Sequence, residues 1–151
     1  MKRETSKHEN LIKRGLRLHE RFRYNEALRF FEEAFRLAPS CPAAIYNLAN
    51  TLHMIDKEKE AQHLLSKLIR MSDTELAAGC PGLRQPMGFR NDALYLMFHV
   101  MLHWKRSWLQ AFLSAQEHLR NRKRGYKTVW PLQRVRYEIA ELREAFSRSL
   151  E

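Results

Sequence analysis

The sequence LIKRGLRLHERFRYNEALRFF (residues 11–31) returns in related form as IYNLANTLHMIDKEKEAQHLL (residues 45–65), 34 positions later. The paired residues at this spacing are identical or similar: Leu11/Ile45, Gly15/Ala49, Leu18/Leu52, His19/His53, Glu26/Glu60, Ala27/Ala61 and Phe31/Leu65. A repeat of this length is typical of stacked helical hairpins, each of which needs a neighbour to bury its apolar face. The sequence therefore predicts an all-α solenoid.

Local signals place the helices within these repeats. Ser6 and Glu9 have the spacing of a capping box, which predicts a helix beginning near residue 7. Proline cannot continue a helix but is tolerated in its first turn. Pro39 therefore ends a helix that we expect over residues 24–37, and Pro42 begins the next one.

The repeated segment resembles the tetratricopeptide repeat (TPR) family. The residues that carry this resemblance are Arg23-Tyr24-Asn25-Glu26-Ala27, then Phe31, Ala34 and Pro39, and then Ile45-Tyr46-Asn47-Leu48-Ala49-Asn50. The resemblance implies a right-handed superhelical, TPR-like solenoid. It also implies protein binding, in which a partner's peptide segment or helix lies in a concave groove.

We expect residues 1–151 to form a single TPR-like domain. The Gly- and Pro-rich stretch before residue 90 predicts a loop insertion, with one helical turn over residues 74–78 left open. A third hairpin aligns with the second at a spacing of 50, which is 34 plus a 16-residue insertion, but it diverges from the family pattern. The predicted units are repeat 1 (about 8–41), repeat 2 (about 42–75), the loop (about 76–90), divergent repeat 3 (about 91–124) and an amphipathic C-terminal capping helix (about 131–150).

The resemblance places the groove on the first helix of each hairpin. The groove residues expected to contact a partner are Lys13, His19, Tyr46, Asn47, Asn50, His53, Met54, His103 and Trp104. Chaperone-binding members grip a terminal carboxylate with Lys, Arg and Asn side chains. Of the matching positions here only Asn47 fits that pattern, so we do not expect binding of chaperone tails.

Positive charge gathers at both ends of the chain, whose formal net charge is +10. The C-terminal part contains a basic cluster with Tyr126 and Trp130 beside it: Arg120, Arg122, Lys123, Arg124 and Lys127. Cations beside aromatic rings suit single-stranded nucleic acid. The alternative function is therefore that this basic surface binds nucleic acid or an acidic protein.

A third function is self-association as a homodimer. The segment from Ala93 to Trp104 is apolar almost all round, and such a helix is normally covered on both sides. It would be free to pair with a second copy if the C-terminal helix did not cover it.

Several activities find no support in the sequence. It contains no nucleophile or phosphate-binding motif, so we expect no catalytic residues, no enzyme activity and no cofactor. The two cysteines, Cys41 and Cys80, form no Cys-x-x-Cys pair. His19, His53 and His103 occupy equivalent positions, which leaves open a pH-sensitive groove, but repeat ancestry explains them without a metal. With no signal peptide or membrane span expected, we predict a cytoplasmic protein.

Overall fold

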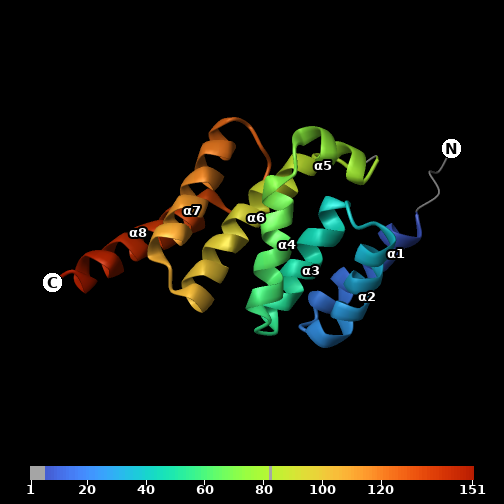
Figure 1. Cartoon of the computed structure of the whole chain (residues 1–151), viewed down its shortest axis with the longest axis horizontal. Helices are drawn as coiled ribbons and strands as arrows, with labels where there is room; N and C mark the ends of the chain where they lie inside the picture. The colour runs from blue at the N-terminus through green and yellow to red at the C-terminus, as the bar shows by residue number, and fades with distance from the viewer. Residues whose placement is uncertain (1–5, 82) are drawn as a thin grey trace.

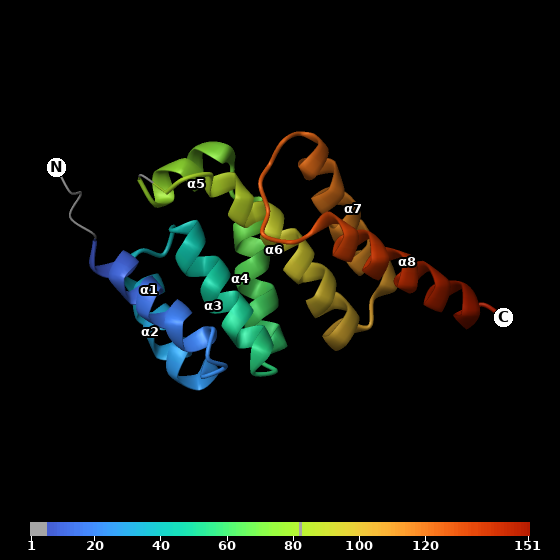
Figure 2. The same cartoon turned by 180° about the vertical axis from the view of Figure 1, so that it is seen from behind.

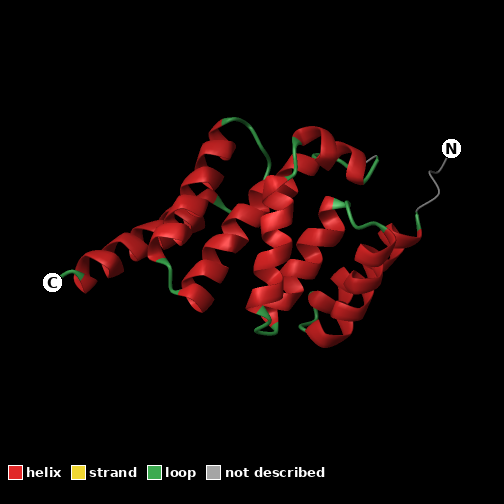
Figure 3. Cartoon of the chain, in the orientation of Figure 1, coloured by secondary structure: helices red, strands yellow, loops and turns green. Residues whose placement is uncertain are grey.

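The computed structural model describes residues 6–81 and 83–151. These residues form helices and the turns between them, with no strand in the described part (Figure 3). The helices are α1 (Lys7–His19), α2 (Tyr24–Leu37), α3 (Pro42–Met54), α4 (Glu58–Arg70), α5 (Asp73–Gly79), α6 (Pro86–Val100), the π-helical turn η1 (Met101–Lys105), α7 (Trp108–Lys123) and α8 (Leu132–Ser149).

Six of the helices form three consecutive hairpins: α1 packs on α2, α3 on α4, and α6 on α7. The hairpins follow one another along the long axis of the molecule, with the chain ends at opposite ends (Figure 1). Helix α3 contacts both α1 and α6, so the first helices of the hairpins lie side by side (Figure 2). The predicted all-α helical repeat is confirmed, and its superhelical handedness stays a prediction.

Each hairpin turns through one residue in the left-handed region. These residues are Phe22 (φ 59°), Asp56 (φ 61°) and Arg106 (φ 48°), and each immediately precedes the N-cap of the second helix. Their spacings of 34 and 50 are those of the sequence alignment, including the 16-residue insertion. The divergent third hairpin therefore turns in the same register as the other two.

The hydrogen bond that closes the third turn spans one residue more than the one that closes the second. The backbone N–H of Ser107 donates to the carbonyl of Met101 (3.0 Å), whereas Lys57 donates to Leu52 (2.9 Å) in the second hairpin. The wider π-helical turn η1 directly precedes this closing hydrogen bond and accounts for its longer span.

The beginnings of the helices follow the sequence signals. The capping box is confirmed, since the Ser6 hydroxyl accepts from the Glu9 backbone (3.4 Å) and the Glu9 carboxylate accepts from the Ser6 backbone (3.2 Å). Pro42 lies in the first turn of α3. Gly15 is buried, and a Cβ there would lie 2.6 Å from the ring of Phe31, so its missing side chain lets α1 and α2 approach closely.

The loop predicted over residues 76–90 is partly wrong. Helix α5 extends to Gly79 behind a second capping box, Ser72 with Glu75, and α6 begins at Pro86. The Gly and Pro residues that suggested a loop have other uses here. Pro86 lies in the first turn of α6, and a Cβ on Gly88 would lie 3.2 Å from the carbonyl oxygen of Lys127.

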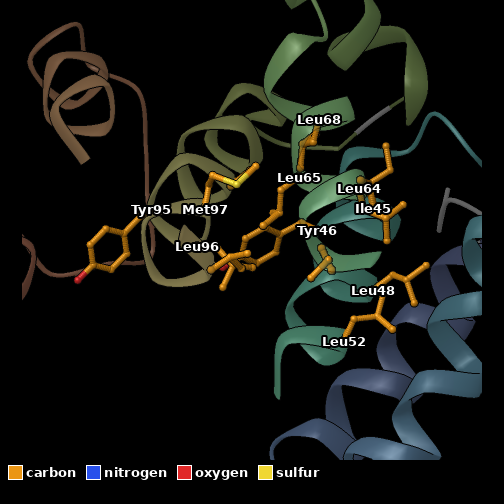
Figure 4. Packing of buried hydrophobic residues seen from close by; sticks show 14 of the residues in the cluster. Ile45, Tyr46, Leu48, Leu52, Leu64, Leu65, Leu68, Tyr95, Leu96 and Met97 are labelled. Atoms are coloured by element: carbon orange, nitrogen blue, oxygen red, sulfur yellow. The ribbon is translucent and has the colours of Figure 1, made fainter. Parts of the chain in front are cut away.

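The core runs through all three hairpins. Figure 4 shows Leu64 of α4 beside Ile45 of α3, and Tyr46 directed from α3 toward Leu96 of α6. Residues 91–98 of α6 are all buried, because α3, α4 and α7 surround this helix. Residues 93–98 are thus covered within one chain and offer no free surface for a second copy, and self-association as a homodimer stays a prediction.

The C-terminal helix α8 covers α7 only in part. Val135, Ile139 and Leu142 are buried, whereas Phe146 and Leu150, which continue the same stripe, are 46% and 74% exposed. Its far end extends away from the hairpins (Figure 2). Among the described helices, none has the length and hydropathy to cross a membrane.

Candidate functional site

The groove predicted on the first helices is largely accessible on α1 and α3. Lys13 is exposed, Met54 is 44% exposed, and His19, Asn50 and His53 are half-buried. At the other end, His103 is exposed and Trp104 is 36% exposed, with the Lys105 ammonium 4.2 Å from the centre of its ring. These residues form the groove face: Lys13, His19, Asn50, His53, Met54, His103 and Trp104.

Two of the predicted contact residues, Tyr46 and Asn47, are engaged in contacts within the chain. Tyr46 is only 7% exposed and its ring packs edge-on against Phe89, with 6.0 Å between the ring centres. Burial raises the pKa of its hydroxyl. The Asn47 side-chain N–H donates to the carbonyl of Ala43 (2.8 Å), so that donor is already used within α3. Tyr46 belongs to the core, and the prediction that it contacts a partner is wrong.

Asn50 and His19 connect α3 to α1. The Asn50 side-chain nitrogen lies 3.5 Å from Nε2 of His19, whose ring packs edge-on against Tyr24 at 4.8 Å. Burial lowers the pKa of His19, which favours the neutral imidazole. The pair therefore presents polar groups on the groove face that keep their arrangement at neutral pH.

Three histidines meet where α3, α6 and η1 come together. The ring centre of His103 lies 6.2 Å from that of His53 and 6.2 Å from that of His99. His53 Nδ1 contacts the carboxylate of Glu58 (2.8 Å), and His99 Nε2 lies 3.1 Å from that of Glu138 on α8. Burial lowers the pKa of His99 to about 4, although Glu138 opposes this shift.

Glu138 connects α8 to the groove. Its carboxylate accepts from the hydroxyl of Tyr95 and from Nε of Arg134 (2.9 Å). Burial raises the pKa of Glu138, but these hydrogen bonds outweigh burial and the pKa is lowered overall. Below the histidines the surface is hollowed into a groove of about 690 Å³, lined chiefly by His99, Leu102, His103, Trp108, Glu138 and Leu142.

The segment between α7 and α8 covers the groove over α6. Trp130 packs on Tyr95, with 4.9 Å between ring centres, and the carboxylate of Asp92 accepts from the Thr128 hydroxyl and the Val129 backbone (3.2 Å). This segment therefore covers the start of α6, whereas the groove-face residues of α1, α3 and η1 are exposed or half-buried.

Asp92 makes this closure depend on pH. Burial raises its pKa to about 6 from an ordinary 3.8, despite the hydrogen bonds that it accepts. The folded state then binds the extra proton between these two pH values, so stability is lost as pH rises through that window. Asp92→Asn keeps an acceptor oxygen but does not titrate. As the pH rises from 4 to 7, the free energy of unfolding of the variant should therefore increase relative to that of wild type by up to about 3 kcal/mol.

Urea unfolding of both proteins at several pH values measures this difference. A difference between the Asn variant and wild type that stays constant across the window would contradict the assignment of a raised pKa to Asp92.

The basic cluster is less free than its sequence suggested. Arg120 and Arg124 pair with Glu117 (3.1 and 3.6 Å), and the Arg122 guanidinium donates to the carbonyl of Trp130. Lys123 and Lys127 are exposed. Both aromatic rings are engaged elsewhere, Trp130 against Tyr95 and Tyr126 beneath the Arg90 guanidinium at 5.7 Å. The predicted stacking of bases on these rings has no support in this arrangement.

An apolar hollow of about 230 Å³ lies between α7 and α8. Its lining is Trp108, Leu109, Phe112, Leu142, Arg143 and Phe146. Leu109 is 68% exposed, so this face, rather than α6, carries the uncovered apolar surface of the third hairpin. The sequence predicted that the C-terminal helix would cover the segment of residues 93–104, whereas α8 packs mainly on α7 and leaves Phe146 and Leu150 exposed.

Comparison with known proteins gives one finding. The tetratricopeptide repeat family pattern matches residues 18–78, from the end of α1 to α5. No curated protein and no solved structure matches the chain. The match covers α2, α3 and α4, and with them the α3 half of the groove face.

Proposed function

Because this chain is a tetratricopeptide repeat protein over residues 18–78, we propose that it binds a segment of another protein on the groove face. Tetratricopeptide repeats generally mediate protein–protein interactions and are typically non-enzymatic. The proposal accordingly assigns the chain no catalytic role. Its place in the cytoplasm stays a prediction.

The observation that carries the proposal is the chemistry of the open part of the groove. Met54 and Trp104 offer adaptable apolar surface at equivalent positions of α3 and η1, and Asn50 offers an amide one helical turn before Met54. An amide can donate to and accept from the backbone of an extended segment. Lys13 adds a cation at the α1 end, which favours a segment with an acidic residue there.

Selection of binding peptides from a random display library tests this function without requiring that the partner be identified first. The affinity of the best peptide is then measured for wild type and for the Asn50→Ala/Met54→Ala variant. Truncation of interface residues at the centre of a contact commonly costs more than 1 kcal/mol. We expect at least about a 10-fold loss of affinity, which corresponds to about 1.4 kcal/mol.

The matched control is His63→Ala, which changes a residue of α4 outside the groove face. It should leave the affinity unchanged, and both variants should keep their unfolding free energy within about 1 kcal/mol of wild type, because none of the changed side chains belongs to the buried core. Equal binding by the groove variant and the control would place the peptide site elsewhere. Binding that disappears with added salt in both would favour the basic cluster instead.

A further inference from the structure

Three side chains that are far apart in the sequence meet beside the N-terminal end of α3, whereas His53 lies in its last turn. They are His8 in the first turn of α1, Cys41 at the N-cap of α3, and Cys80 at the C-cap of α5. One ligand atom from each, a ring nitrogen and two Sγ atoms, lies within 4.8 Å of the other two. We propose that these three residues bind one Zn²⁺ ion.

The distances suit a tetrahedral ion. With Zn–S near 2.3 Å and Zn–N near 2.0 Å, tetrahedral ligands lie roughly 3.5 Å apart for nitrogen and sulfur, and roughly 3.8 Å for two sulfurs. His8 Nε2 and Cys80 Sγ are 3.6 Å apart. The remaining separations are at most 4.8 Å, so the two sulfurs would need to approach by no more than about 1 Å, and the His8 nitrogen and Cys41 Sγ by no more than about 1.3 Å.

The His8 ring is oriented as a metal ligand would be. Its Nδ1 lies 3.0 Å from the Ser6 hydroxyl, whereas Nε2 lies 3.5 Å from that hydroxyl and 3.6 Å from Cys80 Sγ. Donation from Nδ1–H to Ser6 leaves a lone pair on Nε2, and ligating histidines are normally held by such a hydrogen bond from the other ring nitrogen. The capping box that begins α1 fixes Ser6 and thereby the ring.

Close packing of the backbone places the two sulfurs. Cys41 is 0% and Cys80 is 3% exposed. Gly79 lies so close to the Ser40 carbonyl oxygen that a Cβ on it would be 1.8 Å away. This approach places Cys80 beside Cys41. Both residues cap helices, Cys80 at the end of α5 and Cys41 at the beginning of α3, so neither lies in a long loop.

The donor set selects the metal. Two thiolates and an imidazole are soft and borderline ligands that suit Zn²⁺, whereas Mg²⁺ and Ca²⁺ prefer oxygen. His8 is half-buried, which leaves the fourth position to water. Binding releases the two thiol protons, so the site is electrically neutral when filled. The ion would join α1, the turn before α3 and the end of α5.

Cobalt substitution provides the test on the full chain. The protein is reduced, freed of metal with a chelator, checked for two free thiols and titrated with Co²⁺. A tetrahedral thiolate site gives visible cobalt bands and a sulfur-to-cobalt absorption in the near ultraviolet. Because the sequence contains only two cysteines, a thiolate signal reports this site alone. We expect one Co²⁺ per chain, displaced by one Zn²⁺.

The His8→Ala variant tests the three-residue set, with His63→Ala on α4 as the matched control. Even the loss of an outer partner of a ligand costs about 10- to 100-fold in affinity. His8→Ala should therefore bind Co²⁺ at least about 10-fold more weakly, and the control should bind as wild type. Absence of the thiolate absorption with both thiols free, or equal affinity of His8→Ala and wild type, would overturn the proposal.

Discussion

Phe31→Ala is expected to lower the free energy of unfolding by about 3–5 kcal/mol, the usual cost of removing a buried Phe side chain. Phe31 is 0% exposed and its ring lies directly against Gly15. The cavity cannot close easily, because α1 and α2 already meet through that glycine. Urea unfolding followed by circular dichroism measures the loss.

The adjacent Phe30 provides a matched control. It lies outside the buried core, and its ring lies under the Arg14 guanidinium at 4.7 Å, so Phe30→Ala should cost about 1 kcal/mol. Equal losses at the two positions would contradict the packing described for Phe31. A second check uses Phe31→Leu, which makes room for a Cβ at position 15. Gly15→Ala should then be less destabilising when combined with Phe31→Leu than in wild type.

Gly79→Ala is expected to cost about 3 kcal/mol, at the upper end of overpacking effects. The new Cβ would lie 1.8 Å from the Ser40 carbonyl oxygen, and a backbone atom cannot move aside as the tip of a side chain can. Helix α5 should separate from the start of α3, so amide hydrogen exchange over residues 73–79 should become faster.

Ala77→Ser is the control, since Ala77 is exposed in the same helix. It should leave both stability and exchange close to wild type. If Gly79→Ala is as stable as this control, the close approach between α5 and Ser40 does not exist as described. The placement of Cys80 beside Cys41 would then lose its support too.

Signals within a few residues predicted much of the fold. The Ser6–Glu9 capping box and Pro42 mark the beginnings of α1 and α3. The 34-residue spacing, extended by the insertion, also predicted where the third hairpin turns. The stretch before residue 90 was mispredicted because glycine is typical of loops, whereas Gly88 allows close contact between α6 and Lys127. Residues near Gly88 in the sequence do not indicate that contact.

The parts of the candidate site that occupy equivalent positions of the repeat could be predicted from the sequence. Equivalent positions of His53 and His103 indicated that these two rings would be near each other, and their centres are 6.2 Å apart. His19 lies instead beside Asn50. The cover formed by Trp130 was missed, because it depends on hydrogen bonds between Asp92 and residues 36 and 37 positions away.

The cluster of His8, Cys41 and Cys80 was missed for a related reason. His8 and Cys80 are 72 positions apart, and no short motif connects residues that only tertiary packing brings together. The one local hint is that each cysteine precedes a proline, at the beginning of α3 and just after α5.

Whether the groove face is the binding surface is decided by amide chemical-shift mapping of the display-selected peptide on the isotopically labelled full chain. We expect the largest shifts on the groove face, around His19, Asn50, Met54 and His103. Shifts confined to Arg120–Lys127, with the groove face unchanged, would show that the peptide binds the basic cluster and that the groove face is not the site.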